Sequence, residues 1–174
     1  MNAMRAQVPA LLGFFLLSLS LAFAVTAEAF DLALGGYAFA ALLGPRLLRA
    51  RTAGAALRES LARVLPLALW VTLGLEGFLP ALWVAALVGC DVLIAVGVLR
   101  AGDGAPLGGL LRLHGLLEGA FLLALLLALQ GPPFAFLAPL VFGSRYLLLL
   151  TGVLAAWLSL RGPRRVADAK AESP

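Results

Sequence analysis

The sequence has very few of the residues that build redox, metal or catalytic centres. Cys90 is the only cysteine, so neither an internal disulfide nor a CxxC redox pair can form. His114 is the only histidine, and one imidazole with carboxylates is a thin ligand set for a metal. The chain also has no nucleophile elbow, HExxH motif or phosphate-binding glycine loop. We therefore predict no metal and no cofactor, and the sequence leans against an enzyme.

Charge is scarce as well. Only 13% of the residues are charged, 63% are hydrophobic, and the mean hydropathy is +1.03. A soluble domain has about half apolar and about a quarter charged residues, so this composition predicts a lipid bilayer as the main partner. The net charge of +4 comes from arginines near the ends of apolar runs. Such charges indicate orientation in a membrane and not nucleic-acid binding.

Six apolar runs predict one transmembrane domain over residues 1–160, because about 20 apolar residues cross a bilayer. The fold class is an all-α polytopic integral membrane protein, a compact bundle of six transmembrane helices. The predicted spans are 9–27, 32–48, 64–79, 82–99, 113–130 and 134–160. Pro139 and Gly143 interrupt the last run, which is either a kinked or broken helix or a re-entrant piece over 134–145 followed by a span.

The two termini allow further predictions. Residues 1–27 could be a cleaved signal peptide, with Arg5 ahead of the apolar segment and a small-residue site ending at Ala27. A first span is favoured, because five further apolar runs follow and this run is close to full length. Residues 161–174 form a polar tail that we expect to be disordered.

The distribution of Lys and Arg predicts the orientation. With six spans and both termini cytoplasmic, twelve of the thirteen basic residues fall on the cytoplasmic side and Arg145 alone falls outside. Five of the twelve lie in a basic loop over residues 46–63, either a plain loop or an interfacial amphipathic helix. Positive charge marks the cytoplasmic side, so we predict a multi-pass protein of a bacterial cytoplasmic (inner) membrane. The bacterial origin is an inference from a composition rich in Leu and Ala with one lysine.

Three ionisable residues interrupt the fourth and fifth spans. Asp91 lies near the middle of one apolar run, and His114 and Glu118 lie four residues apart on the same helical face of the next. Ionisable side chains at membrane depth are costly and mark functional sites by default. We expect antiparallel neighbouring helices to bring Asp91 and Glu118 to similar levels.

Three interpretations of these residues remain open. Asp91, Glu118 and His114 could form a proton or cation relay, with His114 exchanging protons near neutral pH. They could hold a metal, which the thin ligand set disfavours. They could also form a polar clamp, in which Asp91 pairs with Arg145. Arg145 could instead extend to the outer interface beside Tyr146.

Small and aromatic residues give two packing predictions. The patterns Ala85-x-x-x-Gly89 and Gly115-x-x-x-Gly119 predict a close approach of the fourth and fifth spans. The aromatic residues with a polar edge lie near span ends and are expected to anchor the interfaces: Trp70, Trp83, Trp157, Tyr37 and Tyr146.

Three functions fit this sequence. The first is a small transporter or transporter subunit with a polar path around Asp91, Glu118 and His114, and with Arg145 as a further candidate. The second is a membrane-embedded enzyme that acts on a lipid-like substrate and uses Asp91 and His114 as acid and base. The third is an assembly or structural subunit of a larger membrane complex. Other membrane subunits are therefore candidate partners, and nucleic acid is not.

Overall fold

All regular structure in the part of the chain that the computed structural model describes, residues 2–51, 60, 62–101 and 109–161, is helical. Its α-helices are α1 (Asn2–Thr26), α2 (Phe30–Arg51), α4 (Val64–Leu75), α5 (Ala81–Ala101), α6 (Gly109–Ala128) and α7 (Ala138–Arg161). A 3-10 helix, η1 (Pro132–Leu137), leads into α7. Apolar runs of helical length, separated by Gly and Pro turns, account for this pattern.

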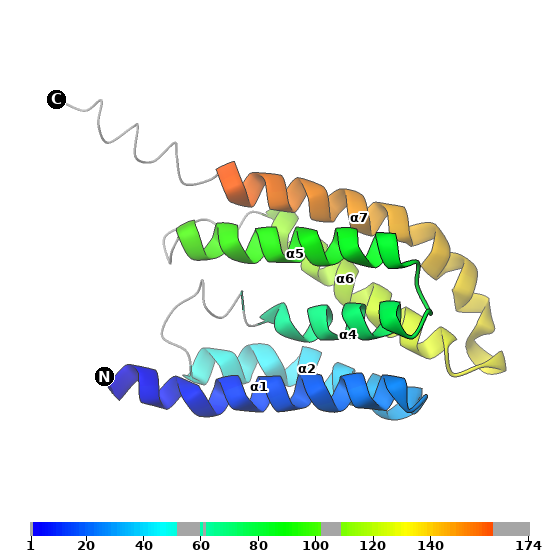
Figure 1. The fold of residues 1–174 in the computed structure, drawn as a ribbon, viewed down its shortest axis with the longest axis horizontal. Coiled ribbons are helices and arrows are strands. Elements are labelled where there is room, and N and C mark those ends of the chain that lie inside the picture. The colour runs from blue at the N-terminus through cyan, green and yellow to red at the C-terminus, as the bar shows by residue number, and fades with distance from the viewer. Residues whose placement is uncertain (1, 52–59, 61, 102–108, 162–174) are drawn as a thin grey trace.

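The helices lie side by side in alternating directions (Figure 1). Their main contacts close a ring in the order α1, α2, α6, α7, α5, α4 and back to α1. Contacts between α4 and α6 also cross the ring. Because α7 lies between α5 and α6 in this order, the fourth and fifth predicted spans are not neighbours in the ring.

Three of these helical segments are long and apolar enough to cross a membrane: Ala81–Arg100, Gly109–Ala128 and Pro132–Arg161. Within the residues whose side chains the structure describes, the other three helices contain apolar stretches of 10–17 residues: Leu12–Thr26, Phe30–Leu42 and Val64–Leu75. Among the α-helices with described bounds, α4 is the shortest at 12 residues, or about 18 Å, whereas the hydrocarbon core of a bilayer is about 30 Å thick. Because α4 is short, the place where it begins decides which part of the neighbouring helices its first residues can contact.

Two apolar clusters form the interior, and a polar layer lies between them. The larger cluster includes Trp70, Leu87, Leu122 and Leu148, and the aromatic rings of Trp70, Trp83 and Phe121 contact one another in it. The smaller cluster consists of Ile94, Val98, Leu111, Ala155 and Ala156. On each of α5, α6 and α7, the buried polar residues lie along the helix between the residues of one cluster and those of the other. These polar residues are Asp91, His114, Glu118 and Thr151. Apolar side chains thus enclose the polar layer on both sides along the helices.

The charged residues separate toward opposite ends of the bundle. Glu28, Asp31 and Glu76 are exposed in or beside the turns at one end, whereas Arg100 and Arg161 are exposed at the other. The N-terminal end of α1 lies at the same end as Arg100 and Arg161 (Figure 1). The separation agrees with the asymmetry that the sequence shows.

Several helix limits differ from the predicted spans. Helix α2 continues through Gly44 and Pro45 to Arg51, so the first part of the predicted basic loop is helical. The remainder of that loop and the predicted disordered tail lie largely or wholly outside the described residues. In the last run, residues 134–137 belong to η1, and α7 continues through Gly143 without a break.

Candidate functional site

The centre of the polar layer is an ion pair between Arg63 and Asp91. Arg63 immediately precedes α4, Asp91 lies in the middle of α5, and Arg63 Nη1 donates a 2.5 Å hydrogen bond to Asp91 Oδ1. Both side chains are buried, with relative exposures of 3% and 1%. Asp91 is ten residues from either end of α5, or about 15 Å from each at the helical rise. Helix α4 begins partway along α5 (Figure 1), and the side chain of Arg63 reaches Asp91 from there.

Glu118 joins this pair from α6. The indole Nε1 of Trp70 donates a 2.7 Å hydrogen bond to Glu118 Oε1, and Glu118 Oε2 lies 4.0 Å from Arg63 Nη1. Trp70 is fully buried, so its only polar atom is used on a buried carboxylate. This bond forms where α4 and α6 meet across the ring.

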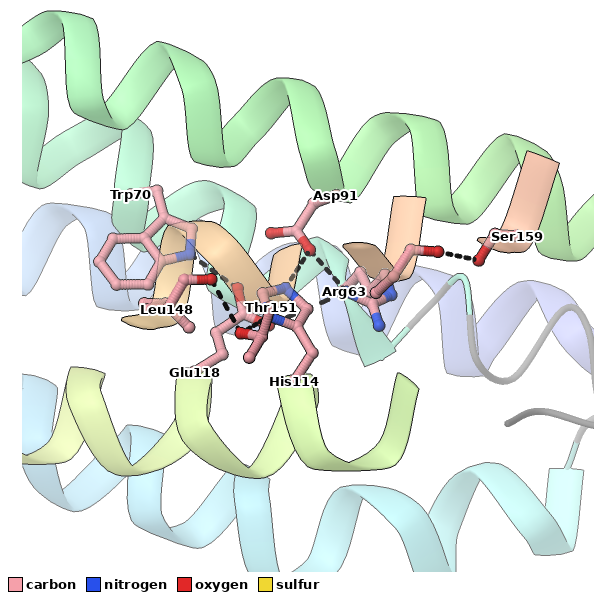
Figure 2. Close-up of polar contacts among 9 residues, drawn as sticks. Arg63, Trp70, Asp91, His114, Glu118, Leu148, Thr151 and Ser159 are labelled. Atoms are coloured by element: carbon pink, nitrogen blue, oxygen red, sulfur yellow. Dashed lines mark hydrogen bonds and ion pairs between the residues drawn. The ribbon is translucent and has the colours of Figure 1, made fainter. Parts of the chain in front are cut away.

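His114 lies one helical turn before Glu118 and completes the group. Its Nε2 lies 3.6 Å from Asp91 Oδ1, and its Nδ1 lies 3.1 Å from Thr151 Oγ1 on α7. Figure 2 shows these side chains converging from α5, α6, α7 and the residue before α4. We refer to Arg63, Asp91, His114 and Glu118 as the buried ionisable cluster.

Counted over the four described side chains, the charges of the cluster balance when one exchangeable proton is bound. The guanidinium of Arg63 is always positive, and two ionised carboxylates then leave the cluster with one excess negative charge. An uncompensated charge in a buried, low-dielectric site is strongly unfavourable. One further proton, on the imidazole or on a carboxyl group, makes the cluster neutral.

The same residues could be considered as metal ligands. Asp91, His114 and Glu118 each offer a ligand atom within 4.8 Å of the others, and all three are buried. A divalent cation beside Arg63 would leave the cluster with a net charge of +1, whereas a proton leaves it neutral. Because Arg63 already serves as the cation of this cluster, we assign no metal site to it.

Arg145 is not part of the cluster, and the predicted pair between Asp91 and Arg145 is wrong because Arg63 takes that place. The Nη2 atom of Arg145 donates a 2.7 Å hydrogen bond to the hydroxyl of Tyr146, and its guanidinium also faces the rings of Tyr146 and Phe142. Trp83, near the start of α5, donates to the backbone oxygen of Arg145 at 3.3 Å. Arg145 thus lies near the acidic end of the bundle, as the alternative interface interpretation requires.

The predicted close approach of α5 and α6 through their small-residue patterns is also wrong. Gly89 and Gly115 are exposed, and a Cβ atom added to either would meet nothing within 4 Å. The close approach occurs instead between α5 and α7, where a Cβ on Gly97 would lie 2.7 Å from the backbone of Ser159. The side chains of Asp91 and His114 meet at the edge of α7 rather than across a tight α5–α6 contact.

Sequence reasoning missed three residues that complete the site. Arg63 was assigned to the basic loop, although a predicted third span of only 64–79 signals a helix that begins inside the bundle. Trp70 was assigned to the interface together with Trp83 and Tyr37, but all three are buried. Thr151 gave a weaker signal, as a lone hydroxyl in the apolar run 147–157.

Comparison with protein-family models, curated proteins and solved structures finds no match to this chain. The buried ionisable cluster, through its geometry and charge, is therefore the main indication of function.

Proposed function

We propose that the protein is a small membrane transporter or transporter subunit, and that the buried ionisable cluster is its proton-binding centre. The observation that carries this proposal is the cluster itself: four ionisable side chains inside an apolar helical bundle, with charges that balance when one proton is bound. Burying such groups costs several kcal/mol, roughly, so their presence argues for a use beyond packing.

The incomplete hydrogen bonding of the cluster favours proton exchange over a static clamp. Asp91 Oδ2 and His114 Nε2 are buried and have no hydrogen-bond partner among the described residues. An unsatisfied buried polar atom costs about 1–3 kcal/mol, and a purely structural network is expected to satisfy its members. Atoms that lack partners in one state are available to bind a proton in another.

The proposed setting is a bacterial inner membrane crossed six times, with both termini cytoplasmic. The exposed arginines at one end of the bundle and the acidic turns at the other support this orientation. Helices α1 and α2 have 25 and 22 residues, enough in length to cross a bilayer. Helix α4, which begins beside the cluster, would form the outer part of the third crossing.

The test is infrared difference spectroscopy of the protein in liposomes, between about pH 5 and 8, where a histidine-linked proton exchanges. We expect protonation bands that titrate as one coupled group, and that change in both Asp91→Asn and Glu118→Gln. The matched control is Glu76→Gln, because Glu76 is exposed in the turn after α4.

The contrary result is also well defined. If no cluster band titrates over this range and both carboxylates remain ionised throughout, the cluster is a permanent salt-bridge clamp. The transporter proposal would then be wrong, and an assembly or structural subunit would be the better interpretation.

A further inference from the structure

Thr151 lies between His114 and the backbone of α7, where its hydroxyl can select which nitrogen of His114 carries a hydrogen. The Thr151 hydroxyl donates its one proton to the backbone oxygen of Leu148, at 2.9 Å. Its oxygen can then only accept toward His114 Nδ1, which lies 3.1 Å away. With the Thr151 proton on Leu148, a hydrogen on His114 Nδ1 completes this contact, because two facing lone pairs would repel each other.

This bond leaves Nε2 as the variable atom of the ring. With a hydrogen on Nδ1, a neutral His114 has its lone pair on Nε2, 3.6 Å from the carboxylate oxygen Oδ1 of Asp91. A lone pair facing a carboxylate is repulsive, and a proton on Nε2 makes the contact attractive. Because His114 is 1% exposed, no bulk solvent screens either interaction.

Two adjacent residues of α7 hold the ring in this orientation. Thr151 bonds Nδ1, and a Cβ atom on Gly152 would lie 3.1 Å from His114 Cε1 and 3.5 Å from Nε2. The imidazole therefore lies directly against the bare backbone of α7, with Nε2 facing α5, as the labelled side chains in Figure 2 show. The bare backbone leaves room for the ring at this position.

We propose that His114 is the group of the cluster that takes up and releases the proton, at Nε2, and that Thr151 is the positioning residue that directs Nε2 toward Asp91. The inference rests on the proposed function and deepens it. Uptake forms one N–H bond from the Nε2 lone pair and a proton supplied by water, and release reverses that step. The imidazolium and Arg63 then neutralise Asp91 and Glu118.

The titratable groups around the ring come from several elements. Arg63 precedes α4, Asp91 and Cys90 lie on α5, and Glu118 lies on α6 with His114. The phenol oxygen of Tyr37 on α2 lies 3.7 Å from a Cβ position on Gly119, the residue after Glu118. Helix α7 presents Thr151 and Gly152, neither of which is charged. The two carboxylates stabilise an imidazolium, and Arg63 opposes it.

The single histidine makes a direct test feasible. Full-length protein labelled with nitrogen-15 histidine and reconstituted in liposomes gives one imidazole signal pair in solid-state NMR. We expect Nδ1 to carry a hydrogen at every pH and Nε2 to gain one as the pH falls. Thr151→Val should shift the ratio of neutral tautomers by roughly tenfold toward Nε2–H, since it removes the hydrogen bond that selects Nδ1–H. Thr151→Ser should restore the wild-type ratio.

Ser159→Ala is the matched control, because Ser159 makes the same kind of bond within α7, to the backbone oxygen of Ala155, away from His114. An unchanged tautomer ratio in Thr151→Val, or an Nε2–H tautomer in the wild type, would overturn the role of Thr151. An Nε2 atom that never changes protonation would overturn the role of His114. Infrared bands from a titrating carboxyl group would in that case leave the proton centre in place at Glu118 or Asp91, whereas their absence would defeat both proposals.

Discussion

The pair formed by Arg63 and Asp91 illustrates how much a single buried contact can determine. Two charges removed from water lose their hydration, and their attraction compensates for that loss only while both are present. Arg63 also lies 4.0 Å from Glu118, so it serves two carboxylates at once. Loss of the arginine should therefore be worse than loss of Asp91.

We predict an order of stability for three variants of this pair. Arg63→Met should lower the free energy of unfolding by about 3–5 kcal/mol, because it leaves buried carboxylates without their guanidinium. Asp91→Leu should cost less, since Glu118 remains beside Arg63. The double variant should be more stable than Arg63→Met, because it removes both charges together.

Thermal unfolding in detergent measures this order, and Arg100→Met provides the control. Arg100 is exposed at the end of α5, so its replacement should change stability by no more than about 0.5 kcal/mol. Equal losses in Arg63→Met and Arg100→Met would contradict the buried position of Arg63.

At the scale of helices, small residues allow close packing only where two backbones actually meet. The most regular small-residue pattern in the sequence does not mark that place. Gly97 faces the backbone of Ser159, whereas Gly89 faces open space on the same helix. A sequence motif cannot distinguish them, because membrane helices are rich in glycine on every face. The neighbour of α5 depends on the order of the ring, which long-range packing determines.

Alanine substitutions at Gly97 and Gly89 should therefore change the stability of the fold in different directions. Gly97→Ala should destabilise the fold by about 1–3 kcal/mol, because the added methyl group meets backbone atoms that cannot move aside. Gly89→Ala should be neutral or stabilise by up to about 1 kcal/mol, since alanine is the better helix former. Thermal unfolding of the two variants side by side checks this, and a tolerant Gly97→Ala would mean that α5 and α7 do not approach closely.

The helical class and much of the site could be predicted from the sequence, for identifiable reasons. Apolar runs of helical length predicted the helices, and the four-residue spacing of His114 and Glu118 predicted their common face. Arg63 could not be placed by the same reasoning, because an arginine beside a basic stretch looks like a loop residue. The partner of Arg63 depends on where α4 begins relative to α5, and the sequence does not contain that information.

For the whole molecule, the charge separation makes the orientation testable. In a Cys90→Ala background, we predict that Glu76→Cys reacts with a membrane-impermeant maleimide on intact spheroplasts. Arg100→Cys, at the other end of α5, should react only after the membrane is opened. Both positions are exposed, so a difference in labelling reports the side of the membrane. Reversed labelling would contradict the orientation, and equal labelling would contradict a crossing by α5.

The location of Asp91 halfway along α5 has an electrical consequence. With α5 spanning the bilayer as proposed, a proton that reached the cluster from either side would cross about half of the transmembrane voltage. A full crossing changes the free energy of one elementary charge by about 2.3 kcal/mol per 100 mV, so half a crossing changes it by about 1.2 kcal/mol. At 100 mV that amount alters the proton-binding constant of the cluster about sevenfold. The energised state of the cell would then control how often the centre is loaded, with no change in the pH of either compartment.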